Sequence, residues 1–352
     1  MKTTHIVQHP KQLTKAWAQH LVSQYDPNAT VQALTIGSVD VGTTTRVRLH
    51  VQHNALQLPA YWFIKLPSLA WRARTITALP RLLTTEIGFY CQLAGQLPVK
   101  RVRCLAASQQ LGIGSTLVLE DVCEQRAVAG QVGAVLTLSQ TYCVIEQLAK
   151  LHAQFWQRAH LHPWLKRSVR RLEDNLGSVL AAPLMRRALT LAGQNVPASL
   201  HKPALAYASE RRAIMALLHD APLTLVHHDC HTGNLFWHNA QQVGFLDWQL
   251  VRLGEGVGDV AYLLATALEP ALRCQHETAL LNHYRRCLAA LGIALPIEHL
   301  MLRYRLHLSY ALEAMLVTLA VGGMMAKQHN LTLIHRAALA VQQQQAYEAL
   351  VL

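Results

Sequence analysis

Three polar side chains, placed around two short apolar runs, could together bind a metal ion. Asp229 and Asn234 lie five positions apart in the segment LVHHDCHTGNLFW, residues 225–237. Asp247 follows the next apolar run, in GFLDWQ, residues 244–249. A loop between two short strands can direct two carboxylates and an amide oxygen into one cleft. Such oxygen ligands suit Mg²⁺ that carries the phosphates of a nucleotide.

Phosphoryl transfer is the chemistry that fits this set of residues, because it asks little covalent work of the protein. The reaction needs the γ-phosphate and the acceptor oxygen in line, a metal that neutralises charge, and a carboxylate that receives the hydroxyl proton. An aspartate with an ordinary pKa of about 4 is a weak base at neutral pH. It suffices because positioning contributes roughly 7–11 kcal/mol in favourable intramolecular cases.

The order and spacing of several motifs resemble a known family. The motifs are FIKLP (63–67), EIGFY (86–90), LVLEDV (117–122), HHDCHTGN (227–234), LDWQ (246–249) and GDVA (258–261). Together they resemble the catalytic core of the aminoglycoside phosphotransferase and choline kinase-like superfamily, whose members are small-molecule relatives of the protein kinases. The segment LAKLHAQFW, residues 148–156, is similar to the ecdysteroid kinase-like branch in particular.

The resemblance implies roles for the polar residues of the last three motifs, HHDCHTGN, LDWQ and GDVA. Asp229 would be the catalytic base beside the acceptor hydroxyl, and Asn234 would complete the catalytic set. Asn234 and Asp247 would hold Mg²⁺. Asp259 would brace the loop that carries Asp229 and would cap its own helix, while His227 would pack within that loop.

The resemblance also implies an ATP site in the N-terminal part of the chain. Lys65 would contact the α- and β-phosphates and would be oriented by an ion pair with Glu86. The backbone from Glu120 to Val122 would hydrogen-bond to adenine. A turn within residues 37–44 would cover the phosphates, and its candidate contacts are Gly37, Gly42 and Thr43.

Three features depart from the pattern of protein kinases. The turn at residues 37–44 has fewer glycines, so hydroxyl groups and backbone amides would make its contacts. Trp248 and Gln249 stand where protein kinases have Phe-Gly. His228 replaces the arginine that binds a phosphorylated activation loop, which argues against regulation by such phosphorylation.

The hydrophobic pattern predicts mainly strands before residue 121 and mainly helices after it. The predicted strands cover residues 31–37, 44–52, 60–66, 102–106, 116–120, 223–226 and 243–246, with a turn at 37–42. The predicted helices cover residues 10–23, 81–97, 144–155, 281–291, 297–321 and 331–350.

These elements predict an α+β fold with two lobes, and the resemblance implies that this is the protein-kinase-like fold. The N-lobe, residues 1–122, would be a small antiparallel sheet with one helix and would bind the nucleotide. The C-lobe, residues 123–352, would be larger and mainly helical. It would carry the catalytic loop and the acceptor pocket.

The composition indicates a globular protein of about two domains. Hydrophobic residues make up 51% of the 352 residues and charged ones only 15%, the opposite of what a disordered chain needs. Lys and Arg number 32 against 20 Asp and Glu, and the net charge of +12 favours anionic partners. The excess is spread over both halves without a basic tail, which argues against a nucleic-acid partner.

The charge also bears on the acceptor. Residues after 122 include 20 Lys and Arg against 15 Asp and Glu, whereas a polycationic aminoglycoside would prefer an acidic cleft. The favoured acceptor is therefore a neutral or lipophilic alcohol, and an aminoglycoside or choline-type substrate is the alternative. Two alternatives from other classes are a catalytically degenerate, nucleotide-binding scaffold and a nucleic-acid-binding protein.

Two other types of site fit the sequence poorly. The histidines and the cysteine of residues 227–231 suggest zinc, but adjacent side chains cannot all converge on one ion. Residues 37–44 resemble a Walker A loop, but Thr43 stands where that loop needs a lysine.

The cysteines and the apolar runs bear on location. The seven cysteines form no C-x-x-C pair, which indicates reduced and mostly buried thiols. Residues 1–20 lack the apolar run of a signal peptide, and neither 127–145 nor 314–326 fits a membrane span. A soluble, cytoplasmic protein without membrane insertion is therefore expected, and its oligomeric state is not predicted.

Overall fold

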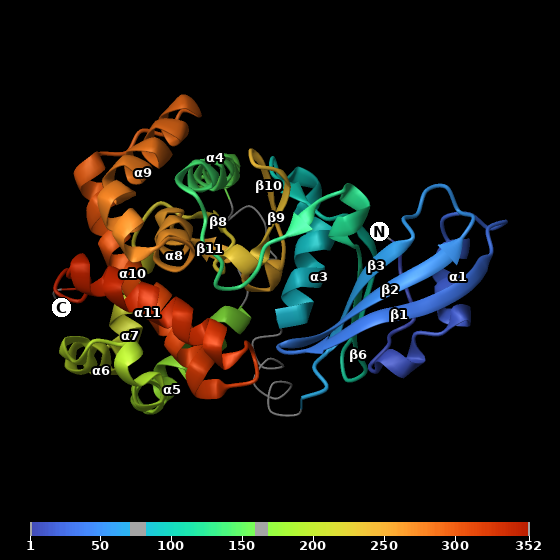
Figure 1. Cartoon of the computed structure of the whole chain (residues 1–352), viewed down its shortest axis with the longest axis horizontal. Coiled ribbons are helices and arrows are strands. Elements are labelled where there is room, and N and C mark those ends of the chain that lie inside the picture. Colours follow the sequence, from blue (N-terminus) through green and yellow to red (C-terminus); the bar gives the residue numbers. More distant parts are fainter. Residues whose placement is uncertain (1, 71–81, 159–167, 351–352) are drawn as a thin grey trace. The chain divides into compact units, whose positions relative to one another are not determined.

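The computed structural model describes residues 2–70, 82–158 and 168–350. The chain divides into two compact units (Figure 1). Unit 1 is Met1–Ala129 together with Phe245–Leu250, and unit 2 is Gly130–Gly244 together with Val251–Leu352. The division after Ala129 lies beyond the boundary at residue 122 that the sequence suggests, and the short segment Phe245–Leu250 returns to unit 1.

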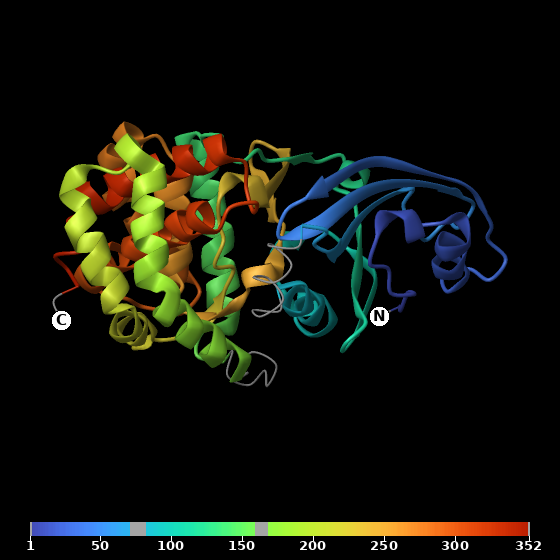
Figure 2. The same ribbon diagram turned by 90° about the horizontal axis from the view of Figure 1, so that it is seen from below.

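Unit 1 contains a five-stranded antiparallel sheet in the order β1-β2-β3-β6-β5, whose strands twist along their length (Figure 2). The strands are β1 (Val31–Val41), β2 (Thr44–His53), β3 (Tyr61–Pro67), β5 (Cys104–Gln110) and β6 (Gly114–Glu120). The unit also contains the helices α1 (Lys15–Ser23) and α3 (Leu82–Gln92) and the two-residue strands β4 (Lys100–Arg101) and β7 (Val128–Ala129).

The alternation of side chains along β3 places apolar residues on one face of the sheet and Lys65 on the other. Trp62, Ile64 and Leu66 are buried in a hydrophobic cluster that includes Trp17 of α1. Lys65 points to the opposite face, and α3 packs against β3, β5 and β6. The period of two in the sequence of β3 therefore separates the core of the sheet from the polar side chain that it carries.

The turn between β1 and β2 is shorter than the sequence pattern predicts. β1 continues to Val41, so the turn predicted at residues 37–42 is wrong in its bounds. Gly37 lies inside β1, at an irregularity of the register that is typical of a β-bulge. Gly42 and Thr43 form the turn itself, and the Ser68 hydroxyl donates to the Gly42 carbonyl over 2.6 Å.

Unit 2 is mainly helical, and α10 is its central helix because it packs against α5, α8 and α11 (Figure 1). The helices are α4 (Leu138–Phe155), α5 (Ser168–Ala192), α6 (His201–Ser209), α7 (Arg211–His219), α8 (Val257–Ala267), α9 (Pro270–Ala290), α10 (Ile297–Val321) and α11 (Lys327–Gln343). The short strands are β8 (Thr224–Val226), β9 (Leu235–Asn239), β11 (Arg252–Gly254) and β10 (Gln242–Phe245), whose last residue belongs to unit 1.

Several predicted elements differ from the structure at their ends. The helix predicted at 81–97 is α3, which ends at Gln92, and its predicted first residue lies outside the described part of the chain. The helix predicted at 10–23 starts at Lys15, after a separate 3₁₀ turn at Pro10–Gln12. α10 has the predicted bounds, whereas α11 ends at Gln343 rather than at 350. β9 was not predicted.

The structure shows how deeply the cysteines are buried and how apolar the helices are. None of the seven cysteines, all of which lie in the described ranges, forms a disulfide bond, but only Cys230 is buried, so the expectation of mostly buried thiols is wrong. Within the described ranges, no helix is both long enough and apolar enough to cross a membrane.

Candidate functional site

The segment from His227 to Asn234, called the 227–234 loop below, follows β8 and folds back on the backbone of Asp229. The Asp229 carbonyl accepts hydrogen bonds from the His231 N–H over 3.0 Å and from Asn234 Nδ2 over 2.9 Å. These bonds hold the second half of the loop against Asp229. They bring Asp229 and Asn234 together, as the sequence predicts.

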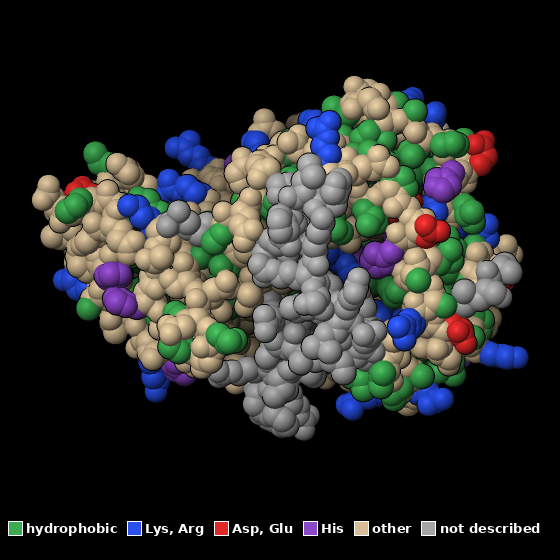
Figure 3. All heavy atoms as spheres, turned by 180° about the vertical axis from the view of Figure 1, so that it is seen from behind, with side chains coloured by type: hydrophobic (Ala, Val, Ile, Leu, Met, Phe, Trp, Pro, Cys, Tyr) green, Lys and Arg blue, Asp and Glu red, His purple; other side chains and the backbone are tan. Residues whose placement is uncertain are grey.

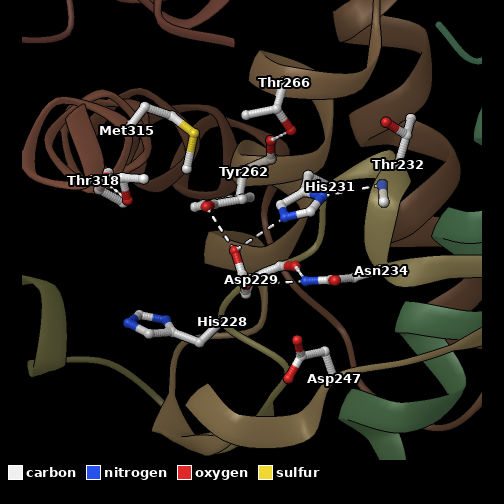
Figure 4. Close-up of polar contacts among 12 residues, drawn as sticks. His228, Asp229, His231, Thr232, Asn234, Asp247, Tyr262, Thr266, Met315 and Thr318 are labelled. Carbon is white, nitrogen blue, oxygen red and sulfur yellow. Dashed lines mark hydrogen bonds and ion pairs between the residues drawn. The ribbon is translucent and has the colours of Figure 1, made fainter. Parts of the chain in front are cut away.

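The carboxylate of Asp229 is held by side chains from the loop and from α8 (Figure 4). Tyr262 donates its hydroxyl to Oδ1 over 2.8 Å, and Asn234 Nδ2 donates to Oδ2 over 3.0 Å. His231 Nε2 lies 3.8 Å from Oδ1. The Asp229 side chain keeps 14% of its surface exposed, so it remains open to a reactant.

Asp259, in the first turn of α8, braces the 227–234 loop. Its carboxylate accepts the backbone N–H groups of His227 and His228, each over 2.7 Å, and lies 3.2 Å from His152 Nε2. Burial alone would raise the pKa of Asp259, but its hydrogen bonds with His152 and the His227 amide lower that pKa below its ordinary value. The brace implied by the family resemblance is thus present.

The expectation that Asp259 also caps its helix is wrong. The N-cap of α8 is Gly256, and no side chain makes a cap hydrogen bond there. The Asp259 carboxylate instead serves the amides of the loop. A hydrogen bond of 2.8 Å between Tyr284 and His152 Nδ1 orients the imidazole that faces Asp259.

His228 has a left-handed backbone, with φ of 68°, which is uncommon for a residue with a side chain. Its ring stacks on Tyr310 of α10, with the ring centroids 4.5 Å apart. The side chain is directed away from the Asp229 carboxylate (Figure 4). The position that holds arginine in protein kinases is therefore used here for packing against α10.

In unit 1, Lys65 lies between two carboxylates. Its Nζ is 2.9 Å and 2.7 Å from the two oxygens of Glu86 on α3, and 2.8 Å from Asp247 Oδ1. Lys65 is only 3% exposed and Glu86 is fully buried. The ion pair of Lys65 and Glu86 that the resemblance implies is therefore present, and Asp247 joins it.

Burial and the neighbouring charges act against each other in this group. Burial would lower the pKa of Lys65, but the charges of Asp247 and Glu86 raise it, so the ammonium form is favoured. Burial raises the pKa of Glu86 to about 7, although Lys65 opposes this shift. One ammonium ion, that of Lys65, thus faces the buried acid Glu86 and the partly exposed acid Asp247.

Asp247 is bound to Lys65 of β3, and the next residue, Trp248, is held by α3. Asp247 has a φ of 57°, a conformation that costs energy for a residue with a side chain and that is found at functional sites. The Trp248 N–H donates to Glu86 Oε1 over 3.3 Å, and its ring stacks on Phe89 with centroids 4.3 Å apart. Trp248 is fully buried, so the residue in place of the kinase Phe is part of the core of unit 1.

The segment from Glu120 to Val122 is tied to the sheet by its backbone. The Glu120 N–H donates to the Arg103 carbonyl over 2.9 Å, and the Asp121 N–H donates to the Tyr61 carbonyl over 3.0 Å. The Asp121 carboxylate caps the following 3₁₀ turn, which starts at Val122. Any ligand of this segment would therefore have to use other backbone groups than these two amides.

The sequence patterns missed one residue that contacts the predicted base, Tyr262. Its signal is the spacing Asp259-x-x-Tyr262, since residues three apart share a helix face and the first of them holds the loop. His152 and Tyr284, which hold Asp259, were also missed as a pair. They lie on α4 and α9, far apart in sequence, so no local pattern joins them.

The described part of the chain holds no group of three or more His, Cys, Asp or Glu side chains that could bind a metal ion. A site for Mg²⁺ does not require such a group. Magnesium is usually bound through one or two carboxylates together with water and substrate phosphates.

Comparison with solved structures defines the class of fold. Wild-type aminoglycoside 2'-phosphotransferase-IIIa, in its GDP complex, is similar with a TM-score of 0.52 at 11% identity, over 95% of this chain and 99% of that chain. Choline kinase LicA from Streptococcus pneumoniae is similar with a TM-score of 0.50 at 13% identity, over 93% and 98% of the two chains. The chain therefore has the α+β protein-kinase-like fold, and the predicted fold class is confirmed.

The family follows from the sequence itself. The model of the ecdysteroid kinase-like family matches residues 42–295, which is well over half of the chain. The chain therefore belongs to the ecdysteroid kinase-like family, a family of small-molecule phosphotransferases. No curated protein matches the sequence. The predicted family and the predicted enzyme class are both confirmed.

Proposed function

We propose that this protein is an ATP- and Mg²⁺-dependent kinase that phosphorylates a hydroxyl group of a neutral or lipophilic small molecule. In the proposed reaction, the acceptor oxygen forms a bond to the γ-phosphorus of ATP. The bond from that phosphorus to the β–γ bridging oxygen breaks, and ADP leaves. The proton of the acceptor hydroxyl passes to the carboxylate of Asp229.

The observation that carries the proposal is the environment of Lys65. A buried ammonium ion is costly unless it is paired, and here it lies within 2.9 Å of both Glu86 and Asp247. A phosphate group brings the negative charge that such an ammonium ion can share. In the proposal, Lys65 contacts the α- and β-phosphates while Glu86 holds it in place.

The proposed metal ligands are Asn234 and Asp247. Carboxylate and amide oxygens are ligands that Mg²⁺ accepts, with phosphate oxygens completing its coordination. Asn234 donates a hydrogen bond to Asp229 through Nδ2. The Oδ1 atom of Asn234 would therefore be the atom that binds the metal ion. Bound Mg²⁺ would neutralise the charge that develops on the transferred phosphate.

The remaining nucleotide contacts are also part of the proposal. Adenine would lie against the backbone from Glu120 to Val122. The N–H groups of Glu120 and Asp121 are already bonded within unit 1, and Val122 begins the 3₁₀ turn that follows. The β1–β2 hairpin would cover the phosphates, through Gly42 and Thr43 at its turn and Gly37 within β1.

The side chains beside Asp229 support a neutral acceptor. Tyr262 of α8, which binds the Asp229 carboxylate, carries no charge, and neither do Met315 and Thr318 of α10, which are drawn on the far side of Tyr262 from Asp229 (Figure 4). The nearby acid Glu313 is already bound by Tyr207 and Arg211. In the proposal, a polycationic acceptor would therefore find little free negative charge among these side chains of α8 and α10.

The proposal includes neither a nucleic-acid partner nor a location outside the cytoplasm. On the face drawn in Figure 3, Lys and Arg side chains are scattered among neutral ones rather than gathered into one stripe. Nucleic-acid binding usually depends on such a basic patch or stripe.

A thermal-shift assay with MgATP tests the nucleotide site. Saturation at about a hundredfold excess over Kd should add about 2.7 kcal/mol of stability. ATP with EDTA should add less, because the proposed ligands Asn234 and Asp247 would then have no metal ion to hold. A chain that shows no shift with MgATP but binds DNA in a strongly salt-dependent way would contradict the proposal.

Two carboxamide variants test the proposed roles of the carboxylates. Asp229→Asn should keep the thermal shift with MgATP and lose most turnover, because the loop survives while the base is gone. Asp247→Asn should also lose the metal-dependent part of the shift. Turnover equal to that of the original protein in either variant would overturn its assigned role.

A screen of alcohols for consumption of ATP would identify the acceptor. Neutral and lipophilic alcohols should give turnover, whereas aminoglycosides and choline should give little. Efficient phosphorylation of an aminoglycoside would contradict the proposed acceptor class and leave the kinase assignment intact.

A further inference from the structure

A single face of α8 contacts three consecutive residues of the 227–234 loop. Asp259 accepts the N–H groups of His227 and His228, and Tyr262, three positions later, donates its hydroxyl to the Asp229 side chain. Residues three apart lie on the same side of a helix. The helix thus holds the backbone of the loop with one residue and the end of the Asp229 side chain with the other.

Tyr262 supplies one of the two short hydrogen bonds that fix the carboxylate. The Tyr262 hydroxyl binds Oδ1 over 2.8 Å, and Asn234 Nδ2 binds Oδ2 over 3.0 Å. His231 Nε2, at 3.8 Å from Oδ1, is too distant for a hydrogen bond. With a donor on each oxygen, the carboxylate has a defined plane, and loss of either donor frees rotation about the Cβ–Cγ bond.

The position of Tyr262 is itself well determined. Its side chain is 3% exposed and lies in the middle of α8, where its carbonyl accepts the Thr266 hydroxyl over 2.7 Å. Burial, reinforced by the charge of Asp229, raises the pKa of Tyr262 well above its ordinary value. The phenol therefore stays protonated at neutral pH, and its hydroxyl donates to Asp229.

We infer that Tyr262 is a positioning residue for phosphoryl transfer, whose hydroxyl holds the carboxylate of Asp229 in the orientation that receives the proton of the acceptor. This inference rests on the proposed role of Asp229 as the base. Tyr262 does not touch the reacting atoms. It acts through Asp229, since misplacement of a catalytic group by about 1 Å can lower the rate about a hundredfold.

The test is Tyr262→Phe, which removes the hydroxyl and keeps the ring. Turnover and KM for MgATP are measured with water as the acceptor, and again with the alcohol that gives the highest turnover in the screen. We expect kcat to fall by about tenfold or more. The KM for MgATP and the thermal shift that MgATP produces should stay as in the original protein.

Tyr347→Phe is the matched control. Tyr347 is also a tyrosine of unit 2 with a buried hydroxyl, but this hydroxyl makes no hydrogen bond within the part of the chain that the structure describes. Its removal should leave both kcat and KM unchanged. A fall in kcat equal to that of Tyr262→Phe would show a general effect of removing a buried hydroxyl, and would overturn the inference.

Two further outcomes separate the inference from the proposed function. An unchanged kcat in Tyr262→Phe, alongside an inactive Asp229→Asn, would overturn the positioning role and leave the kinase assignment standing. A Tyr262→Phe protein that loses the MgATP thermal shift together with kcat would show a structural role instead. Full activity in Asp229→Asn would contradict the proposed base itself.

Discussion

Gly256 occupies a point before α8 where there is no room for a side chain. A Cβ atom there would lie 2.5 Å from the Tyr284 hydroxyl and 2.7 Å from His152 Nδ1. We expect Gly256→Ala to force these two side chains apart and so to weaken the contact of His152 with Asp259. The expected loss is about 1–3 kcal/mol of unfolding free energy, as for other overpacked cores, with a parallel fall in turnover. Urea denaturation and steady-state kinetics would measure both.

Gly95→Ala is the control for this substitution, because a Cβ at Gly95 would meet no atom within 4 Å. It should leave the unfolding free energy nearly unchanged. A Gly256→Ala protein as stable and as active as the Gly95→Ala protein would show that the loop does not depend on the His152–Tyr284 pair.

At the scale of residues, the motifs predicted the groups whose spacing is local or is fixed by the family. Asp229 and Asn234 share one loop, and Lys65 and Glu86 belong to two motifs of the resemblance, so each pair was predicted. Tyr262 was not, because its contact with Asp229 spans 33 positions and depends on the way α8 packs under the loop. Such contacts become visible only in the folded chain.

At the scale of elements, α10 is joined to α7 and to the segment before α8 by one arginine. Arg303 Nε donates to Glu255 over 2.7 Å, and its terminal nitrogens donate to the carbonyls of Leu217 and Leu218 near the end of α7. The last carbonyls of a helix have no partner within it. We expect Arg303→Met to cost about 3 kcal/mol or more of unfolding free energy, since Glu255 then stays buried with only His307 beside it.

Arg305→Met, on the same helix, provides the comparison for the urea experiment. Among the described residues, the Arg305 side chain donates to the carbonyls of Gln344 and Gln345 and to no carboxylate. Its loss should cost about 1 kcal/mol or less. Equal losses in the two variants would contradict the special role assigned to the pair of Arg303 and Glu255.

The elements that the sequence predicted best are long and strongly periodic. α10 has the predicted bounds because its apolar stripe continues without a break from Ile297 to Val321. β9 was missed because its five residues follow directly on the polar 227–234 loop and show no clear alternation. The turn between β1 and β2 was misplaced because Gly37, taken as its start, is accommodated by a bulge within the strand.

At the scale of the whole molecule, the segment Phe245–Leu250 belongs to unit 1 although its neighbours in sequence belong to unit 2. The reason is chemical: Asp247 binds Lys65, and the Trp248 ring stacks on Phe89. The hydrophobic pattern predicts a strand that ends at this segment. It cannot predict to which unit the segment belongs, because the contact of Lys65 with Asp247 joins residues 182 positions apart.

Two buried carboxyl groups connect the stability of unit 2 to pH. Burial alone would raise the pKa values of Asp259 and Glu255, but hydrogen bonds and nearby cationic or imidazole groups lower them below their ordinary values of 3.8 and 4.5. A lowered pKa means that the folded state favours the ionised form. The stability that these groups contribute is therefore complete above the ordinary values and is lost as the pH falls through the lowered ones.

We expect Asp259→Asn to lower the unfolding free energy at neutral pH, because an amide cannot accept both loop N–H groups and the His152 contact as a carboxylate does. The deficit should shrink as the pH falls below the ordinary value of 3.8, because the unfolded chain is then protonated at this carboxyl group and the folded Asp259 loses its charge as the pH passes its lowered pKa. Urea denaturation over this range measures the deficit, and the exposed Glu348→Gln should follow the original protein throughout. A deficit of constant size down to about pH 3 would mean that the charge of Asp259 does not stabilise the fold, and the lowered pKa would then lack its proposed cause.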